Sequence, residues 1–390
     1  MKKLKLFVMF SLLLVSLFNL AGCGEKVKVT HISSKEDLLL LQDGGNFILD
    51  NDIDCEGLSL KAIQNFSGSI DGNGYVIKNV NFISDNHCFG LIGSIATSSS
   101  VTFKNLGIVD FTIDTLKATS TNSLYAGGLL ASNLQNNDAQ NFNEIIIENC
   151  YADGDINIDI NVKDLYVGGL VGASNRPVTI NNSYSDVDIE CDLNDSSFSS
   201  FNAKVGGLMG YSWSYRSHPS YFNNNVFTGS IDVDTTLGIS LKSNIKAGGI
   251  VGAMDGYHEM SYCLSTPDYI LASSFFKDNV YIGGLTGHFS EWNGAITYSY
   301  YCNYDDDSLI ENERHQKCSI YQGNTYAYGT GVKLYKTDML SKDFMKGDYT
   351  FTDLDGKRKD SFLNFSEEIW NFGKFDGDNF INPSLKVFDK

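Results

Sequence analysis

Acidic residues alternate with apolar residues in two segments, at positions 155–160 and 188–192. Asp155 and Asp159 fall on one face of the first segment, and Asp188 and Glu190 on one face of the second, because side chains alternate across a β-strand. Carboxylates on neighbouring strands would lie about 4.8 Å apart and repel each other unless water screens them or a hard cation bridges them. These four residues are therefore candidate Ca²⁺ ligands. The alternative is a solvated acidic face, and no other cofactor is expected.

Aromatic residues gather after two copies of a glycine-rich motif, where loops are expected. Trp213, Tyr215 and Tyr221 follow one copy, and His288 and Trp292 follow another. Aromatic loops on one edge of a repeat protein can stack on sugar rings or hold a peptide. These five residues are the candidate ligand-binding residues, with ordinary loop packing as the alternative.

Paired carboxylates are the third group that could do chemistry, because glycosidases and polysaccharide lyases depend on them. Asp50, Asp52, Asp54 and Asp71 lie near the start of the repeats. Strand ends and turns favour Asp for conformational reasons alone. We therefore assign no catalytic residue, and an enzyme that acts on a polysaccharide is the alternative to a non-catalytic role.

A recurring Gly-Gly motif indicates the elements that must hold these residues. A Gly-Gly pair followed by Leu or Ile occurs five times, with its first glycines 41, 38, 42 and 35 residues apart. The pairs begin at Gly127, Gly168, Gly206, Gly248 and Gly283, and a looser copy spans residues 89–93. Units of this length that repeat are typical of stacked architectures, in which no single unit can bury its own apolar face.

The repeats favour a parallel β-helix over other repeat architectures. Helical repeats need apolar residues about 3.6 positions apart, and this spacing is not found in the repeats. A propeller blade needs four strands, whereas only two or three can be placed in each repeat. In a β-helix, a Gly-Gly pair lets backbones pass close together, and Asn side chains at one place in successive repeats can stack. Asn149, Asn182 and Asn225 each stand two residues before an aromatic residue and are expected to form such a row. The expected fold class is therefore all-β, a parallel β-helix solenoid.

Both ends of such a solenoid expose strand edges that need covers. Ser34 is expected to cap a helix that ends at Gly44, because Ser begins helices and Gly ends them. Short helices are expected at residues 337–346 and 366–371. We therefore expect an N-terminal helical cap and a small C-terminal α+β cap.

The N-terminal segment has the organisation of a bacterial lipoprotein signal peptide. Lys2, Lys3 and Lys5 precede an apolar run at residues 6–17, which is too short to span a membrane comfortably. Small residues then lead to Cys23 in a pattern that resembles a lipobox, so cleavage before Cys23 and its acylation are expected. Two or more acyl chains would hold the protein stably at a membrane. The expected division of the chain is a signal peptide at 1–22, a tether at 23–33 that begins with the lipidated Cys23, a β-helix at 34–304 and a C-terminal capping region at 305–390.

The charge of the chain limits its partners. The formal net charge is −18, and it becomes −21 once the three lysines of the signal segment are removed. An acidic surface argues against nucleic acid as a partner. We expect a monomer on the extracellular side of the cell membrane, or on the outer membrane of a two-membrane envelope. Its expected partners are the membrane, through the N-terminal lipid, and a glycan or protein ligand.

The motif resembles the GLUG repeats of a family of bacterial surface proteins, named for a Gly-Leu-x-Gly signature. The copies match it with Ile250 in place of Leu and Ala131 in place of the last Gly. The Asn-Ser-Tyr segment at 182–184 and the opening segment at 53–79 are also similar. The resemblance covers residues 34–304 and, weakly, the C-terminal tail. It implies a right-handed β-helix on the cell surface and no single activity.

Some members of that family are immunoglobulin A metalloproteases, whose zinc motif needs two His residues four positions apart. Here Tyr262 stands four positions after His258, where the second His would be needed. The resemblance therefore implies no protease activity. A non-catalytic binding or adhesion role through one face of the β-helix is expected, with a polysaccharide-acting enzyme and a purely structural surface protein as alternatives.

Overall fold

The computed structural model describes residues 28–115, 121–134, 143–160, 162–193, 200–235, 243–274, 280–290, 294–302, 319–321, 324–325, 330–332, 334–377 and 379–389. The expected signal segment, Cys23 and Trp292 lie outside these residues. Within the described ranges, no helix is both long and apolar enough to cross a membrane.

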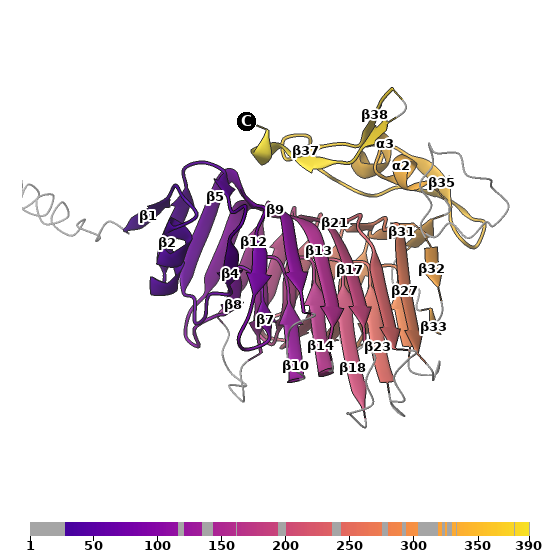
Figure 1. Cartoon of the computed structure of the whole chain (residues 1–390). Helices are drawn as coiled ribbons and strands as arrows, with labels where there is room; N and C mark the ends of the chain where they lie inside the picture. The colour runs from indigo at the N-terminus through magenta and orange to yellow at the C-terminus, as the bar shows by residue number, and fades with distance from the viewer. Residues whose placement is uncertain are drawn as a thin grey trace, which may run out of the picture.

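The protein consists mostly of β-strands in parallel sheets that run along the length of the molecule (Figure 1). Sheet 1 contains β1 (Val29–Ile32), β2 (Gly45–Leu49), β3 (Ile53–Asp54), β4 (Ser59–Lys61), β5 (Gly68–Lys78), β6 (Asn81–Ile83), β9 (Val101–Asp114), β12 (Ile145–Glu148), β13 (Tyr151–Asp159), β16 (Val178–Asn181), β17 (Tyr184–Asp192), β20 (Ser220–Asn223), β21 (Val226–Phe227), β22 (Ile231–Thr235), β25 (His258–Ser261), β26 (Leu264–Ser265), β27 (Tyr269–Ser274), β30 (Ala295–Thr297), β31 (Tyr300–Cys302), β32 (Ser319–Tyr321) and β34 (Thr330–Val332).

Two further parallel sheets complete the repeats. Sheet 2 contains β7 (Cys88–Phe89), β10 (Thr121–Ala126), β14 (Val162–Gly168), β18 (Phe201–Gly206), β23 (Ser243–Gly248), β28 (Val280–Gly283) and β33 (Asn324–Thr325). Sheet 3 contains β8 (Ile92–Ser94), β11 (Leu130–Asn133), β15 (Val171–Ser174), β19 (Met209–Ser214), β24 (Val251–Gly256) and β29 (Thr286–Phe289). Each strand pairs with its counterpart in the next repeat, as Tyr166 of β14 does with Lys204 of β18.

Alternation of apolar and acidic residues explains why one face of the sheet is buried and the other is exposed. In β17, Val187, Ile189 and Cys191 are buried, whereas Asp188 and Glu190 between them are exposed. This period of two is the signal of a half-buried strand. The buried residues of successive repeats form one continuous apolar core.

The Gly-Gly pairs lie where each strand of sheet 2 turns into a strand of sheet 3. A Cβ atom on Gly206 would lie 2.2 Å from the carbonyl oxygen of Met209, across the turn. A Cβ atom on Gly207 would lie 2.1 Å from the carbonyl oxygen of Gly249 and 2.3 Å from the ring of Phe227. Both positions therefore need glycine because the backbones approach closely, as the repeated motif predicts.

The Asn row contains Asn149 and Asn182 as expected, but its third member is Asn224 in place of Asn225. Asn149, Asn182 and Asn224 have φ angles of 52°, 48° and 54°, and Tyr262 and Tyr298 take the same left-handed conformation in later repeats. Asn tolerates this conformation better than most residues. The expectation for Asn225 was therefore wrong: it is fully buried, and its side chain bonds the carbonyl of Ile180 and the amide of Ser183. Among the positive-φ positions, the Asn149 amide donates to Asn105 Oδ1 at 3.1 Å.

The N-terminal boundary differs from the expected one. Val29–Ile32, expected to belong to the tether, forms β1 and pairs with β2 in sheet 1. The expected helix is a 3₁₀ helix, η1 (Asp37–Asp43), which buries Leu38 and Leu41 and ends at Gly44 with a φ angle of 69°. The Ser34 hydroxyl accepts from the Asp37 amide at 3.3 Å.

The boundary expected at residue 304 is also too early. Parallel pairing continues beyond it, since β32 pairs with β27, β33 with β28 and β34 with β31. The C-terminal segment then contains α2 (Lys336–Met339), α3 (Lys342–Lys346), β35 (Thr350–Thr352), β36 (Arg358–Asp360), β37 (Trp370–Asn371), β38 (Lys374–Asp376), β39 (Asn379–Ile381), β40 (Ser384–Leu385) and η3 (Lys386–Phe388). The helix expected at 366–371 is a turn followed by β37, because Trp370 pairs with Leu385 of β40.

The C-terminal segment lies along the repeats, over one edge of sheet 1 (Figure 1). It covers a row of residues that are aligned across neighbouring strands: Tyr151, Tyr184, Val226, Leu264 and Tyr300. The ring contacts are Phe344 with Tyr300 at 5.6 Å, Trp370 with Tyr184 at 6.5 Å and Phe388 with Tyr151 at 6.4 Å. The segment therefore runs back over successive repeats, whereas the sequence predicts a cap over the last strand edges.

Candidate ligand-binding site

Polar and aromatic side chains from sheets 2 and 3 meet at the corner formed by the Gly-Gly pairs. Tyr125, Tyr166, Lys204 and Lys246 are aligned on four neighbouring strands of sheet 2, each two residues before the first glycine of its pair. Tyr211, Asp255 and His288 approach them from sheet 3. We call these seven residues the corner cluster: Tyr125, Tyr166, Lys204, Tyr211, Lys246, Asp255 and His288.

Aromatic contacts hold the corner cluster together. The rings of Tyr125 and Tyr166 stack with centroids 5.1 Å apart and planes 7° apart. The Lys204 Nζ atom lies 3.4 Å from the centroid of the Tyr211 ring and 5.1 Å from that of Tyr166. These are cation–π distances, so the ammonium bridges the two sheets.

Charges in the corner cluster compensate one another. Burial lowers the pKa of Lys204 to about 8, although the nearby Asp255 carboxylate opposes the shift. Burial alone would raise the pKa of Asp255, but the hydrogen bond from His288 and the charges of Lys246 and Lys204 lower it to about 2. The His288 Nε2 atom lies 3.2 Å from Asp255 Oδ1. The cluster therefore presents a carboxylate, two amines and tyrosine hydroxyls on rigid strands.

The structure brings some of the predicted aromatic residues to this region. Trp213 of β19 is aligned with Asp255, and its ring contacts that of Tyr215 edge to face at 4.3 Å. His288 belongs to the cluster itself. Tyr221 lies apart on β20 of sheet 1, and Trp292 is outside the described residues.

Sequence reasoning missed most of the corner cluster, although the repeats contained a signal for four of its seven residues. The position two residues before each Gly-Gly pair is Tyr or Lys in all five copies. Tyr211 and Asp255 have no such signal, because they meet this row only through the turn between two sheets.

The predicted acidic row is partly aligned. Asp155 pairs in register with Asp188, whereas Glu190 pairs with Asn157, and Asp159 with Asp192. Burial, and then the charge of Asp188, raise the pKa of Asp155. Asp114, Asp159, Glu190 and Asp192 line a shallow depression of about 270 Å³. In the described ranges, no group of three or more acidic, His or Cys side chains is placed to hold a metal ion.

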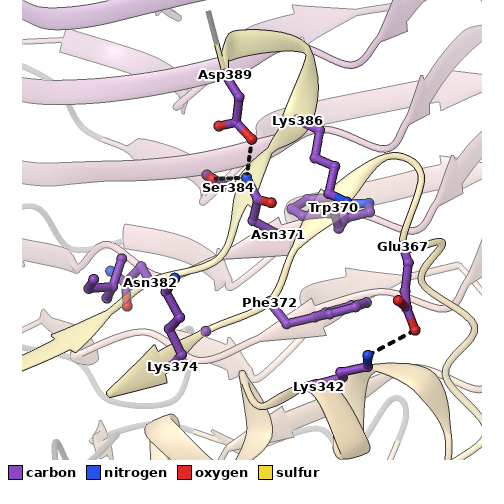
Figure 2. Close-up of a pocket in the computed structure, with 12 residues that line it drawn as sticks. Lys342, Glu367, Trp370, Asn371, Phe372, Lys374, Asn382, Ser384, Lys386 and Asp389 are labelled. Carbon is purple, nitrogen blue, oxygen red and sulfur yellow. Dashed lines mark hydrogen bonds and ion pairs between the residues drawn. The ribbon is translucent and has the colours of Figure 1, made fainter. Parts of the chain in front are cut away.

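A larger pocket of about 580 Å³ lies in the C-terminal segment (Figure 2). It is lined by Lys342, Glu367, Trp370, Asn371, Phe372, Gly373, Lys374, Ile381, Asn382, Ser384, Lys386 and Asp389. Volumes of this size are typical of small-molecule sites. No residue of the pocket was singled out from the sequence as a ligand-binding residue.

Comparison with known proteins shows the fold alone. No family model and no curated protein matches the chain. A crystal structure described as a putative immunoglobulin A1 protease from Bacteroides ovatus is similar, with a TM-score of 0.53 and 16% sequence identity over 86% of this chain and 93% of that chain. In this chain His258 lies on a strand and is buried, with its Nε2 atom 2.9 Å from Ser212 Oγ. Among the described residues, His258 belongs to no group of three or more His, Cys or acidic side chains that could hold a metal ion.

Proposed function

We propose that this chain is a lipid-anchored bacterial surface protein of the GLUG-repeat type that binds a glycan or protein ligand through the corner cluster. The scaffold in this proposal is a right-handed parallel β-helix with a short helical cap. Acylation of Cys23 would hold a monomer on the extracellular side of the membrane. The role is binding or adhesion without catalysis.

The observation that carries the proposal is the corner cluster itself. In an acidic chain, Lys204 and Lys246 stand side by side among tyrosines, and they are held on strands of neighbouring repeats. Rigid strands fix such groups more precisely than loops do. Aromatic rings with polar groups around them suit a sugar or a peptide, because one surface offers both apolar contact and hydrogen bonds.

An array of glycans and host proteins tests this proposal, with residues 24–390 as the soluble probe. We expect a specific ligand whose affinity falls about tenfold or more in Tyr211→Ala and Trp213→Ala. Tyr221→Ala is the matched control, because Tyr221 lies on sheet 1 away from the cluster.

The same array with and without a chelator tests the acidic row. Binding that persists in chelator would argue against a role for this row, and binding that is lost would support Ca²⁺ there. The absence of any ligand would favour a structural surface protein.

One observation favours a polysaccharide lyase as a second candidate. Burial gives Lys204 a pKa of about 8, close to the range in which an amine can act as a base at neutral pH. Asp255 and Tyr211 lie beside it. Incubation with a panel of polyuronides would release unsaturated products that absorb ultraviolet light, and Lys204→Met would abolish the release. A panel that gives no such product in any condition would remove this candidate.

A further inference from the structure

We propose that the pocket of the C-terminal segment binds a small acidic sugar, whose carboxylate accepts hydrogen bonds from Trp370 Nε1 and Lys386 Nζ. The pocket is formed by residues of α3, β37–β40 and η3 and by neighbouring turns, and it shares no residue with the corner cluster. The inference therefore stands independently of the function proposed above.

The indole of Trp370 is the first reason. Trp370 is 1% exposed and lines the pocket, and its Nε1 atom has no hydrogen-bond partner among the described residues. Packing fixes the ring, since Tyr184 contacts it edge-on at 6.5 Å and Phe365 at 5.2 Å. A buried N–H that has no acceptor costs about 1–3 kcal/mol, so an acceptor supplied by a ligand would be favourable.

The charges around the pocket are the second reason. Lys374 and Lys386 both line it, and neither forms an ion pair within the described ranges. Figure 2 shows the Lys386 side chain reaching toward the indole of Trp370. An ammonium and an indole N–H are both donors, so a group that they share must be an acceptor, and an anionic one binds best.

The two carboxylates that line the pocket already have partners within the protein. Glu367 Oε1 lies 3.1 Å from Lys342 Nζ and 2.5 Å from Lys346 Nζ. The Asp389 carboxylate accepts from the Asn371 side-chain amide at 2.7 Å (Figure 2). The lysines therefore neutralise Glu367, whereas Asp389 keeps its charge, and neither carboxylate forms an ion pair with Lys374 or Lys386 among the described residues. The lining has three lysines and two carboxylates, an excess of positive charge in a chain of net charge −18.

The remaining lining groups suit a sugar ring. The Ser384 hydroxyl oxygen already accepts from Asn371 at 3.1 Å, so its hydrogen is available for a ligand. The Asn382 amide nitrogen donates to Asp186 Oδ2 at 3.4 Å, which leaves its side-chain carbonyl as an acceptor for a sugar hydroxyl. Phe372 offers an apolar surface against which the C–H face of a sugar can pack. A pocket of about 580 Å³ has room for one or two sugar rings.

Titration with D-glucuronate, followed by ¹⁵N NMR of the indole groups, tests the proposal. The chain has three Trp residues, and Trp370→Phe assigns the relevant signal. We expect glucuronate to move the Trp370 indole proton downfield and glucose to leave it in place. Lys386→Gln should weaken binding about tenfold, while Lys357→Gln, an exposed lysine outside the pocket, should not weaken it.

Further titrations, with another variant and with other ligands, distinguish this proposal from its alternatives. Lys204→Met should leave glucuronate binding unchanged, whatever the corner cluster binds. An equal shift with acetate or inorganic phosphate would overturn recognition of the sugar and leave a general anion site. An equal shift with glucose would overturn recognition of the carboxylate, and no shift of the indole signal with glucuronate would overturn the site.

Discussion

At the scale of single residues, the ammonium of Lys204 is stabilised by two tyrosine rings while burial disfavours its charge. Its distances to the ring centroids are 3.4 Å for Tyr211 and 5.1 Å for Tyr166. We predict that Lys204 titrates at about pH 8, as burial lowers its pKa. Reductive ¹³C-methylation and an NMR titration measure this value, and Lys204→Arg identifies the signal by its loss. Titration only above about pH 10, as for an ordinary lysine, would contradict the prediction.

The second prediction at this scale concerns how His258 makes the stability of the protein depend on pH. It is 1% exposed, its ring stacks on Phe222 at 6.3 Å, and burial lowers its pKa to about 4. Between about pH 6.5 and pH 4 the unfolded chain binds a proton at His258 that the folded chain does not bind. The free energy of unfolding should therefore decrease as the pH is lowered from about 6.5 to about 4, by on the order of 3 kcal/mol from this residue.

Urea unfolding at pH 7 and pH 4.5 checks the prediction for His258. In His258→Gln, which keeps a polar side chain for Ser212 but does not titrate, the fall between the two pH values should be smaller. If the variant and the parent protein lose the same free energy of unfolding, His258 does not account for the acid sensitivity.

At the scale of elements, the turn between sheets 2 and 3 depends on glycine. We predict that Gly207→Ala destabilises the protein by about 3 kcal/mol, because the new Cβ atom would lie 2.1 Å from the carbonyl oxygen of Gly249 and 2.3 Å from the ring of Phe227. Denaturant unfolding measures the loss. Gly356→Ala is the control: Gly356 has a φ angle of 79° with nothing within 4 Å of the new Cβ atom, so about 1 kcal/mol is expected. Equal losses would show that crowding at the turn is unimportant.

The sequence predicted the elements better than it predicted the contacts between them. The Gly-Gly spacing indicated parallel strands in repeats, because each unit needs the same close approach at the same place. The spacing to the following aromatic residue predicts Asn225 for the row, which is wrong, because the left-handed backbone conformation sets the register and falls on Asn224. The contact between Lys204 and Tyr211 could not be predicted, since it depends on the angle between two sheets.

At the scale of the whole molecule, the C-terminal segment stabilises the side of the repeats. We predict that a chain ending at Val332 keeps its parallel sheets but exposes the row from Tyr151 to Tyr300. Large exposed apolar patches favour association, so this chain should bind an apolar dye and form oligomers in light scattering. A truncated chain that stays monomeric and does not bind the dye would contradict the prediction. Circular dichroism of the two chains shows whether the strands persist.

The way this segment runs back has a consequence for the length of the protein. Its ring contacts pair Phe344 with Tyr300 and Trp370 with Tyr184, and its end places Phe388 beside Gly107. Neighbouring strands are about 4.8 Å apart, so one added or deleted repeat in this stretch would displace every contact beyond it by that distance. Open repeat arrays gain and lose units easily, because each unit contacts only its neighbours. Here the C-terminal segment contacts many units at once. Its contacts can therefore all form only with one number of repeats between Gly107 and Tyr300.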